Sequence, residues 1–116
     1  MATNETQAMD RLELERSGTV VLTLVDDADW ADEQGHIALL QERLNACLGL
    51  VENGEVFVRL KEQLGRPVTK NSAILIRVVA KCAMSPEGAR FFEYARSEFS
   101  EAKVGLSFRL ASDVTA

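Results

Sequence analysis

The N-terminal third of the chain predicts a β-hairpin. Residues 11–16 alternate between apolar and charged positions, and this period of two is typical of a strand with one buried face. Residues 19–25 are β-branched or apolar almost throughout, which favours a more central strand. Ser17 and Gly18 lie between the two segments and form a turn signal, because glycine readily adopts positive φ.

Two longer segments carry the period of an amphipathic helix. The first spans about residues 32–51, and its apolar stripe consists of Ile37, Leu40, Leu44, Cys47, Leu48 and Val51. Ser85 and Pro86 favour the start of the second helix, with serine as the cap and proline at the first helical position. Residues 55–64 fit both a strand and a short helix, and we favour the helix.

Two more strands are predicted at residues 73–83 and 104–111. The resulting order, β-β-α-(α)-β-α-β, contains strand–helix–strand units that predict parallel crossovers. The expected fold is α+β with two layers, in which a four-stranded mixed sheet carries the two main helices on one face. Residues 10–111 would form a single domain, with a disordered tail at 1–9 and a second tail at 112–116.

Composition narrows the possible partners and the location. A chain of 116 residues suits one domain, and its net charge of −5 disfavours nucleic acid and anionic membranes as partners. The N-terminus has no signal-peptide pattern, and no apolar run approaches the roughly 20 residues that span a bilayer. We therefore expect a cytoplasmic protein. Cys47 and Cys82 lie in apolar runs and are interpreted as buried thiols.

An acidic loop precedes the first long helix. It contains Asp26, Asp27, Asp29 and Asp32 around Trp30. We interpret these carboxylates as caps and dipole partners of the helix N-terminus. A divalent metal site is the competing interpretation, but metal loops need more oxygen ligands at defined spacing, so we expect no metal. Trp30 most simply packs the loop against the helix, and ligand stacking is the alternative.

His36, the single histidine, has two interpretations. As a catalyst it would act as a general base oriented by Asp27, Asp29 or Asp32. We favour a surface or boundary histidine that packs near Trp30, because the sequence pairs no nucleophile with it. Serine and cysteine nucleophile motifs and phosphate-binding loops do not occur. We therefore predict no catalytic residue and no cofactor.

A small-ligand site is a further hypothesis. Its candidate residues are Trp30, His36, Gln41 and Asn45. Gln41 and Asn45 are four positions apart, at the edge of the apolar stripe on the predicted helix. Amides in such places often tie down loops, and we favour that structural role over a pocket that they would share with Trp30 and His36.

Two apolar surfaces remain without a partner in the predicted fold. One is the face of the sheet away from the helices, where Val21, Leu75 and Val79 are candidate interface residues. The other is a second row on the long helix that contains Leu39, Ala46 and Leu50. We expect a second copy of the chain, or an unidentified protein, to cover them.

The run from Trp30 through His36 to the segment LQERLNACL at residues 40–48 resembles a family of small bacterial proteins with a domain of unknown function. Cys47 stands where that family more usually has an aromatic residue. The resemblance implies a shared fold and no particular activity. The sequence therefore favours a non-enzymatic interaction or structural module that acts as a homodimer. A small-ligand sensor is the alternative, and a metal-dependent or hydrolytic enzyme ranks third.

Overall fold

A computed structural model describes residues 9–69 and 71–111, so the tails expected at 1–8 and 112–116 lie outside the described residues. Seven elements follow one another along the chain. They are β1 (Arg11–Leu14), β2 (Val20–Asp26), α1 (Glu33–Glu52), α2 (Glu55–Leu64), β3 (Ile74–Ala80), α3 (Pro86–Glu101) and β4 (Val104–Leu110). The predicted α+β order is confirmed, including the short helix at 55–64.

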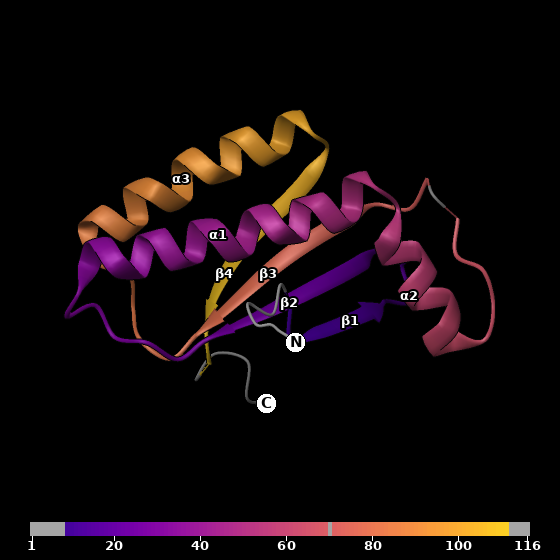
Figure 1. Ribbon diagram of the computed structural model, residues 1–116, viewed down its shortest axis with the longest axis horizontal. Coiled ribbons are helices and arrows are strands. Elements are labelled where there is room, and N and C mark those ends of the chain that lie inside the picture. The colour runs from indigo at the N-terminus through magenta and orange to yellow at the C-terminus, as the bar shows by residue number, and fades with distance from the viewer. Residues whose placement is uncertain (1–8, 70, 112–116) are drawn as a thin grey trace, which may run out of the picture.

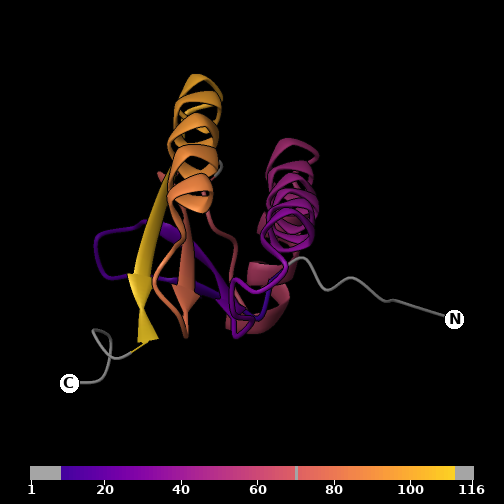
Figure 2. The same ribbon diagram turned by 90° about the vertical axis from the view of Figure 1, so that its left-hand side faces the viewer.

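The four strands form one mixed sheet in the order β1-β2-β3-β4. β1 pairs with β2 in the antiparallel sense, whereas β2, β3 and β4 are parallel to one another. Figures 1 and 2 show α1 and α3 on the same side of this sheet. The three parallel strands end at one edge, and both long helices begin at that edge (Figure 1). Loops that are distant in sequence are thereby brought together.

Side chains alternate between the two faces of the sheet, as strand geometry requires. Even-numbered residues such as Leu22, Ile76 and Leu106 face the helices and form the core with Leu40 and Leu44 of α1 and with residues of α3. We call the opposite surface the open face. It consists of Arg11, Glu13, Val21, Thr23, Val25, Leu75, Arg77, Val79, Gly105, Ser107 and Arg109.

Glycines at positive φ mark both ends of α2, with Gly54 at +81° and Gly65 at +74°. Gly54 follows Asn53, the C-cap of α1, and supplies the left-handed turn between the two helices. α2 then packs against α1 and β1 and places Val56 and Leu60 in the core. No helix within the described residues is both long and apolar enough to cross a bilayer.

Two boundaries differ from the sequence prediction. Met9, which we had assigned to the disordered tail, is buried in the core, and the ordered chain therefore includes it. The buried stripe of α1 begins at His36 rather than at Ile37, which is only half-buried. Just over one turn of helix separates His36 from Leu40, so the histidine lies on the core side with the leucines.

Candidate functional site

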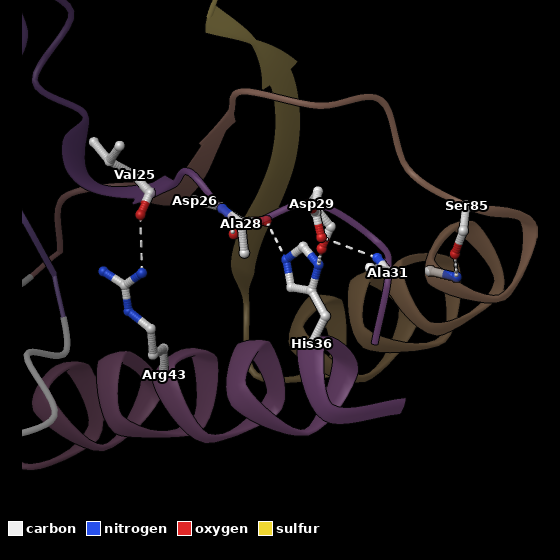
Figure 3. Close-up of polar contacts among 9 residues, drawn as sticks. Val25, Asp26, Ala28, Asp29, Ala31, His36, Arg43 and Ser85 are labelled. Atoms are coloured by element: carbon white, nitrogen blue, oxygen red, sulfur yellow. Dashed lines mark hydrogen bonds and ion pairs between the residues drawn. The ribbon is translucent and has the colours of Figure 1, made fainter. Parts of the chain in front are cut away.

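The polar centre of the molecule is a buried pair formed by Asp26 and His36 (Figure 3). Asp26 is the last residue of β2 and shares the helix-facing side with Leu24. His36 lies in the first turn of α1. Nε2 of the imidazole is 2.7 Å from Oδ2 of the carboxylate, and the two side chains are only 3% and 7% exposed. The pair thus joins the end of a central strand to the start of a helix.

The second ring nitrogen of His36 is also engaged. Nδ1 lies 2.8 Å from the backbone carbonyl oxygen of Asp29. A carbonyl can only accept, so Nδ1 carries a proton and donates it. Nε2 faces a carboxylate oxygen, so a further proton lies between Nε2 and Oδ2 of Asp26. Neither nitrogen is free to take a proton from a substrate in this geometry, and the general-base interpretation has no support from it.

Two of the aspartates named as orienting partners of His36 have carboxylates that bind backbone N–H groups instead. Asp32 caps α1 by accepting a hydrogen bond from the backbone N–H of Gly35 at 3.1 Å. Asp29 accepts from the N–H of Ala31 at 3.0 Å (Figure 3). Capping by Asp32 confirms the structural interpretation for that residue. The same interpretation is wrong for Asp26, which is a buried strand residue that pairs with His36 and does not cap the helix. In the described part of the chain, no three His, Cys, Asp or Glu side chains are grouped so as to hold a metal ion.

Trp30 closes this end of the molecule. Its ring stacks on His36 with centroids 3.8 Å apart and planes 27° apart, as the packing interpretation of the two residues predicted. The indole also contacts the first turn of α3, where a Cβ added to Gly88 would lie 2.5 Å from Cη2 of Trp30. Trp30 therefore joins the acidic loop to the starts of both long helices. Its Nε1 is buried and has no hydrogen-bond partner among the described residues.

A second polar tie connects β2 with α1. Nη1 of Arg43 donates to the carbonyl oxygen of Val25 at 2.9 Å, and Nη2 donates to Oδ2 of Asp10 at 2.8 Å. The same oxygen of Asp10 accepts the backbone N–H of Val25 at 2.7 Å. Asp10 and Arg43 thus satisfy the last open-face residue of β2, where β1 no longer supplies a pairing partner.

The four residues of the hypothetical ligand site do not line one pocket. Gln41 and Asn45 are exposed and border a cavity of about 220 Å³ between α1 and α3. Trp30 and His36 instead pack against each other at the start of α1. The residues of α3 on the far side of the cavity were not identified from the sequence, because helical periodicity does not reveal which helices are neighbours.

The candidate interface residues are unequally exposed. On the open face, Val21 is fully buried within the single chain, Leu75 and Val79 are half-buried, and Val25, which we had not named as an interface residue, is 49% exposed. In the second row on α1, Leu50 packs against the core, Ala46 is half-buried and Leu39 is exposed. The open face is therefore the more continuous of the two candidate surfaces.

The two cysteines differ in reactivity. Burial raises the pKa of the Cys47 thiol to about 12, an effect that the nearby Arg43 only partly offsets. Cys82 is half-buried just beyond β3. We expect iodoacetamide at about pH 8 to alkylate Cys82 and to spare Cys47 in the native protein, because the thiolate is the reactive form. Peptide mass mapping checks this, with urea-unfolded protein as the control, and native modification of both thiols at equal rates would contradict it.

Comparison with known proteins agrees with the resemblance to a domain of unknown function. No curated protein and no solved structure matches the chain. One family model does match, and it covers residues 1–112, nearly the whole sequence. The matched region includes every strand and helix described above, the Asp26–His36 pair and the cavity between α1 and α3. The chain therefore belongs to DUF6572, a family of unknown function.

Proposed function

We propose that this protein is a non-enzymatic interaction module that acts as a homodimer, with the open face of the sheet as the subunit interface. The observation that carries the proposal is an apolar centre on a sheet face that no described helix covers. Val25, Val79 and Thr23 line a shallow hollow of about 280 Å³ there, with charged residues at its rim. An uncovered apolar surface with a polar rim is typical of an interaction site.

The charges of the open face fit a second copy of the chain. The chain as a whole carries −5, which holds copies apart over most of their surface. The open face instead carries both signs, with Arg11 and Glu13 on β1 and arginines on β3 and β4. A two-fold axis parallel to the strands lays β1 of one copy over β4 of the other. Acidic and basic side chains of the open face then meet in one interface.

Two polar atoms on the open face also lack a partner within the described residues. They are Nε of Arg77 and Oγ of Ser107, at paired positions on β3 and β4. Arg77 has an ion pair with Glu15 at 3.7 Å, which leaves Nε unused. Native structures leave few buried polar atoms unpaired. Both atoms are buried within the single chain, so a contact with a second copy would have to be accompanied by a rearrangement of these side chains.

The size of the open face determines how strong such a dimer would be. Four strands about 4.8 Å apart and roughly 23 Å long give a face on the order of 400 Å². A stable interface usually buries about 800 Å² on each partner. A dimer held by this face alone is therefore expected to be reversible. Its mass should rise from the monomer value of 12.8 kDa as the concentration increases.

The test introduces a charge into the apolar hollow of the open face. Val25→Glu should raise the dimer dissociation constant at least about tenfold, because each dimer would then bury two carboxylates among apolar groups. Val58→Glu is the matched control, since Val58 is a 57% exposed valine on α2 and Val25 is 49% exposed. Light scattering over a concentration series measures both variants.

A second pair of variants tests the charge argument separately. Arg109→Glu should weaken the dimer because it replaces a positive charge of the open face by a negative one in each copy, whereas Arg90→Glu makes the same charge change on the exposed surface of α3. If both substitutions weakened the dimer equally, the change in net charge alone would explain the effect, and this result would contradict the proposed interface. A wild-type mass of 12.8 kDa at every concentration would overturn the homodimer itself.

A further inference from the structure

The cavity between α1 and α3 has the form of a small ligand site on the helix side of the molecule. Its volume is about 220 Å³. Leu44, Ala95 and Phe99 form a floor that is at most 6% exposed. Ala95 occupies a position where larger side chains would fill the space, so the cavity exists because this residue is small. The cavity does not depend on the dimer, because its lining contains no residue of the open face.

The rim of the cavity is polar and carries negative charge. Gln41 and Asn45 of α1 face Tyr94 and Glu98 of α3 across the opening. Tyr94 is 65% exposed, which leaves its ring largely accessible at the mouth of the cavity. Its ring and the amide oxygens supply acceptors for a cation.

Glu98 is the charged group that would make the cavity prefer a cationic ligand. On the same helix, Glu87 pairs with Arg90 and Glu93 pairs with Arg96. Among the described residues, Glu98 has no such ion pair. Its carboxylate is therefore available to a cationic ligand at the mouth of an apolar cavity, where a charge is less screened than on an open surface.

The size of the cavity limits the apolar part of the ligand. An apolar cavity of about 150 Å³ is known to hold one benzene molecule. A volume of about 220 Å³ therefore accommodates one aromatic ring and a short arm. We propose that the cavity between α1 and α3 binds a small primary amine that carries one apolar ring, with the ring on Leu44, Ala95 and Phe99 and the ammonium group at Glu98 and Tyr94.

The test uses three probes of one shape and different charge. They are 2-phenylethylamine, the neutral 2-phenylethanol and the anionic 3-phenylpropionate, each titrated into the full-length protein and followed by amide chemical shifts. We expect saturable shifts confined to residues 41–48 and 91–99. The amine should bind about five- to tenfold more tightly than the alcohol, and the anion should bind least.

Two substitutions separate the charge from the cavity. Glu98→Gln should remove the preference for the amine over the alcohol, whereas Glu93→Gln, on the same helix but outside the cavity lining, should preserve it. Ala95→Leu should fill the cavity and lower the affinity for all three probes at least about tenfold. Glu98 is exposed, so its variant tests the proposal even where Ala95→Leu does not fold.

Four results would overturn the proposal. One is the absence of saturable shifts with the amine, and another is equal affinity for the amine and the anion. The third is a preference for the amine that survives Glu98→Gln. Binding of the amine that persists unchanged in a folded Ala95→Leu protein would place the probe elsewhere on the molecule and would likewise contradict the site.

Discussion

Replacement of Asp26 by alanine is expected to lower the free energy of unfolding by about 2–3 kcal/mol. The substitution leaves Nε2 of His36 buried without a hydrogen-bond partner, while Nδ1 remains committed to the carbonyl of Asp29. Removal of one partner of a buried hydrogen bond carries the desolvation cost of the group that is left unsatisfied. Domains of this size have about 5–15 kcal/mol of stability in total. Urea denaturation measures the loss directly.

A variant in the same loop provides the control. Asp29→Ala removes an exposed carboxylate that accepts only the N–H of Ala31 among the described contacts, while the backbone carbonyl that receives Nδ1 of His36 remains. We expect it to cost about 1 kcal/mol. The double variant Asp26→Ala/His36→Ala should cost less than the sum of its single variants, since neither buried partner is then left unsatisfied. A loss below about 1 kcal/mol for Asp26→Ala would contradict the importance of the pair.

The second large effect concerns two glycines inside helices. We expect replacement by alanine to destabilise the protein at one of them and to stabilise it at the other. A Cβ at Gly88 would lie 2.5 Å from Trp30, whereas a Cβ at Gly49 would meet nothing within 4 Å. Gly88→Ala should therefore destabilise the protein by about 1–3 kcal/mol through overpacking. Gly49→Ala should stabilise it by about 0.5–1 kcal/mol, because alanine loses less backbone entropy on folding. Thermal and urea unfolding of both variants measure the contrast.

The contact with Trp30 predicts a coupling between the two positions. The atoms nearest the added Cβ belong to the outer part of the indole ring, which a phenylalanine at position 30 would lack. Trp30→Phe should therefore reduce the cost of Gly88→Ala by about 1 kcal/mol or more in a double-mutant cycle. Additive effects would place the origin of the Gly88 effect outside this contact, for instance in the capping of α3 by Ser85.

Most of the fold could be predicted from the sequence because its elements carry clear local signals. Residues 74–80 are apolar and β-branched at the centre of the sheet, and Ser85 with Pro86 marks the start of α3 as expected. Residues 55–64 were ambiguous because ten residues satisfy both periods in part. The glycines at both ends, which have positive φ in the structure, favour the helix that was found.

The Asp26–His36 pair was missed although its signal was present. Asp26 continues the even-numbered, inward side of β2, and His36 stands four positions before Leu40 on the buried side of α1. The sequence prediction named the acidic residues at 27, 29 and 32 as possible partners of His36, because they are closer to it in sequence. The two periodicities, read together, place a carboxylate and an imidazole on the same buried side.

The contacts between α1 and α3 could not be obtained in this way. Tyr94 and Glu98 face Gln41 and Asn45 only because β3 and β4 lie next to β2 in that order, which brings the two helices side by side. The close approach of Trp30 to Gly88 depends on the same arrangement. Strand order results from competition among many long-range contacts, and local patterns carry little information about it.

The parallel pairing of β2 with β3 has a consequence for the newly made chain. β2 reads VVLTLVD, with six uncharged residues of high β propensity. Its partner β3 follows only after α1 and α2, so at ordinary rates of translation β2 waits on the order of several seconds for it. During that time the strand is an aggregation hazard. The end of this strand carries the acidic residues Asp26, Asp27 and Asp29, whose charges repel other unfolded chains. The acidic loop is therefore expected to reduce aggregation of the newly made chain, in addition to its role in the folded protein.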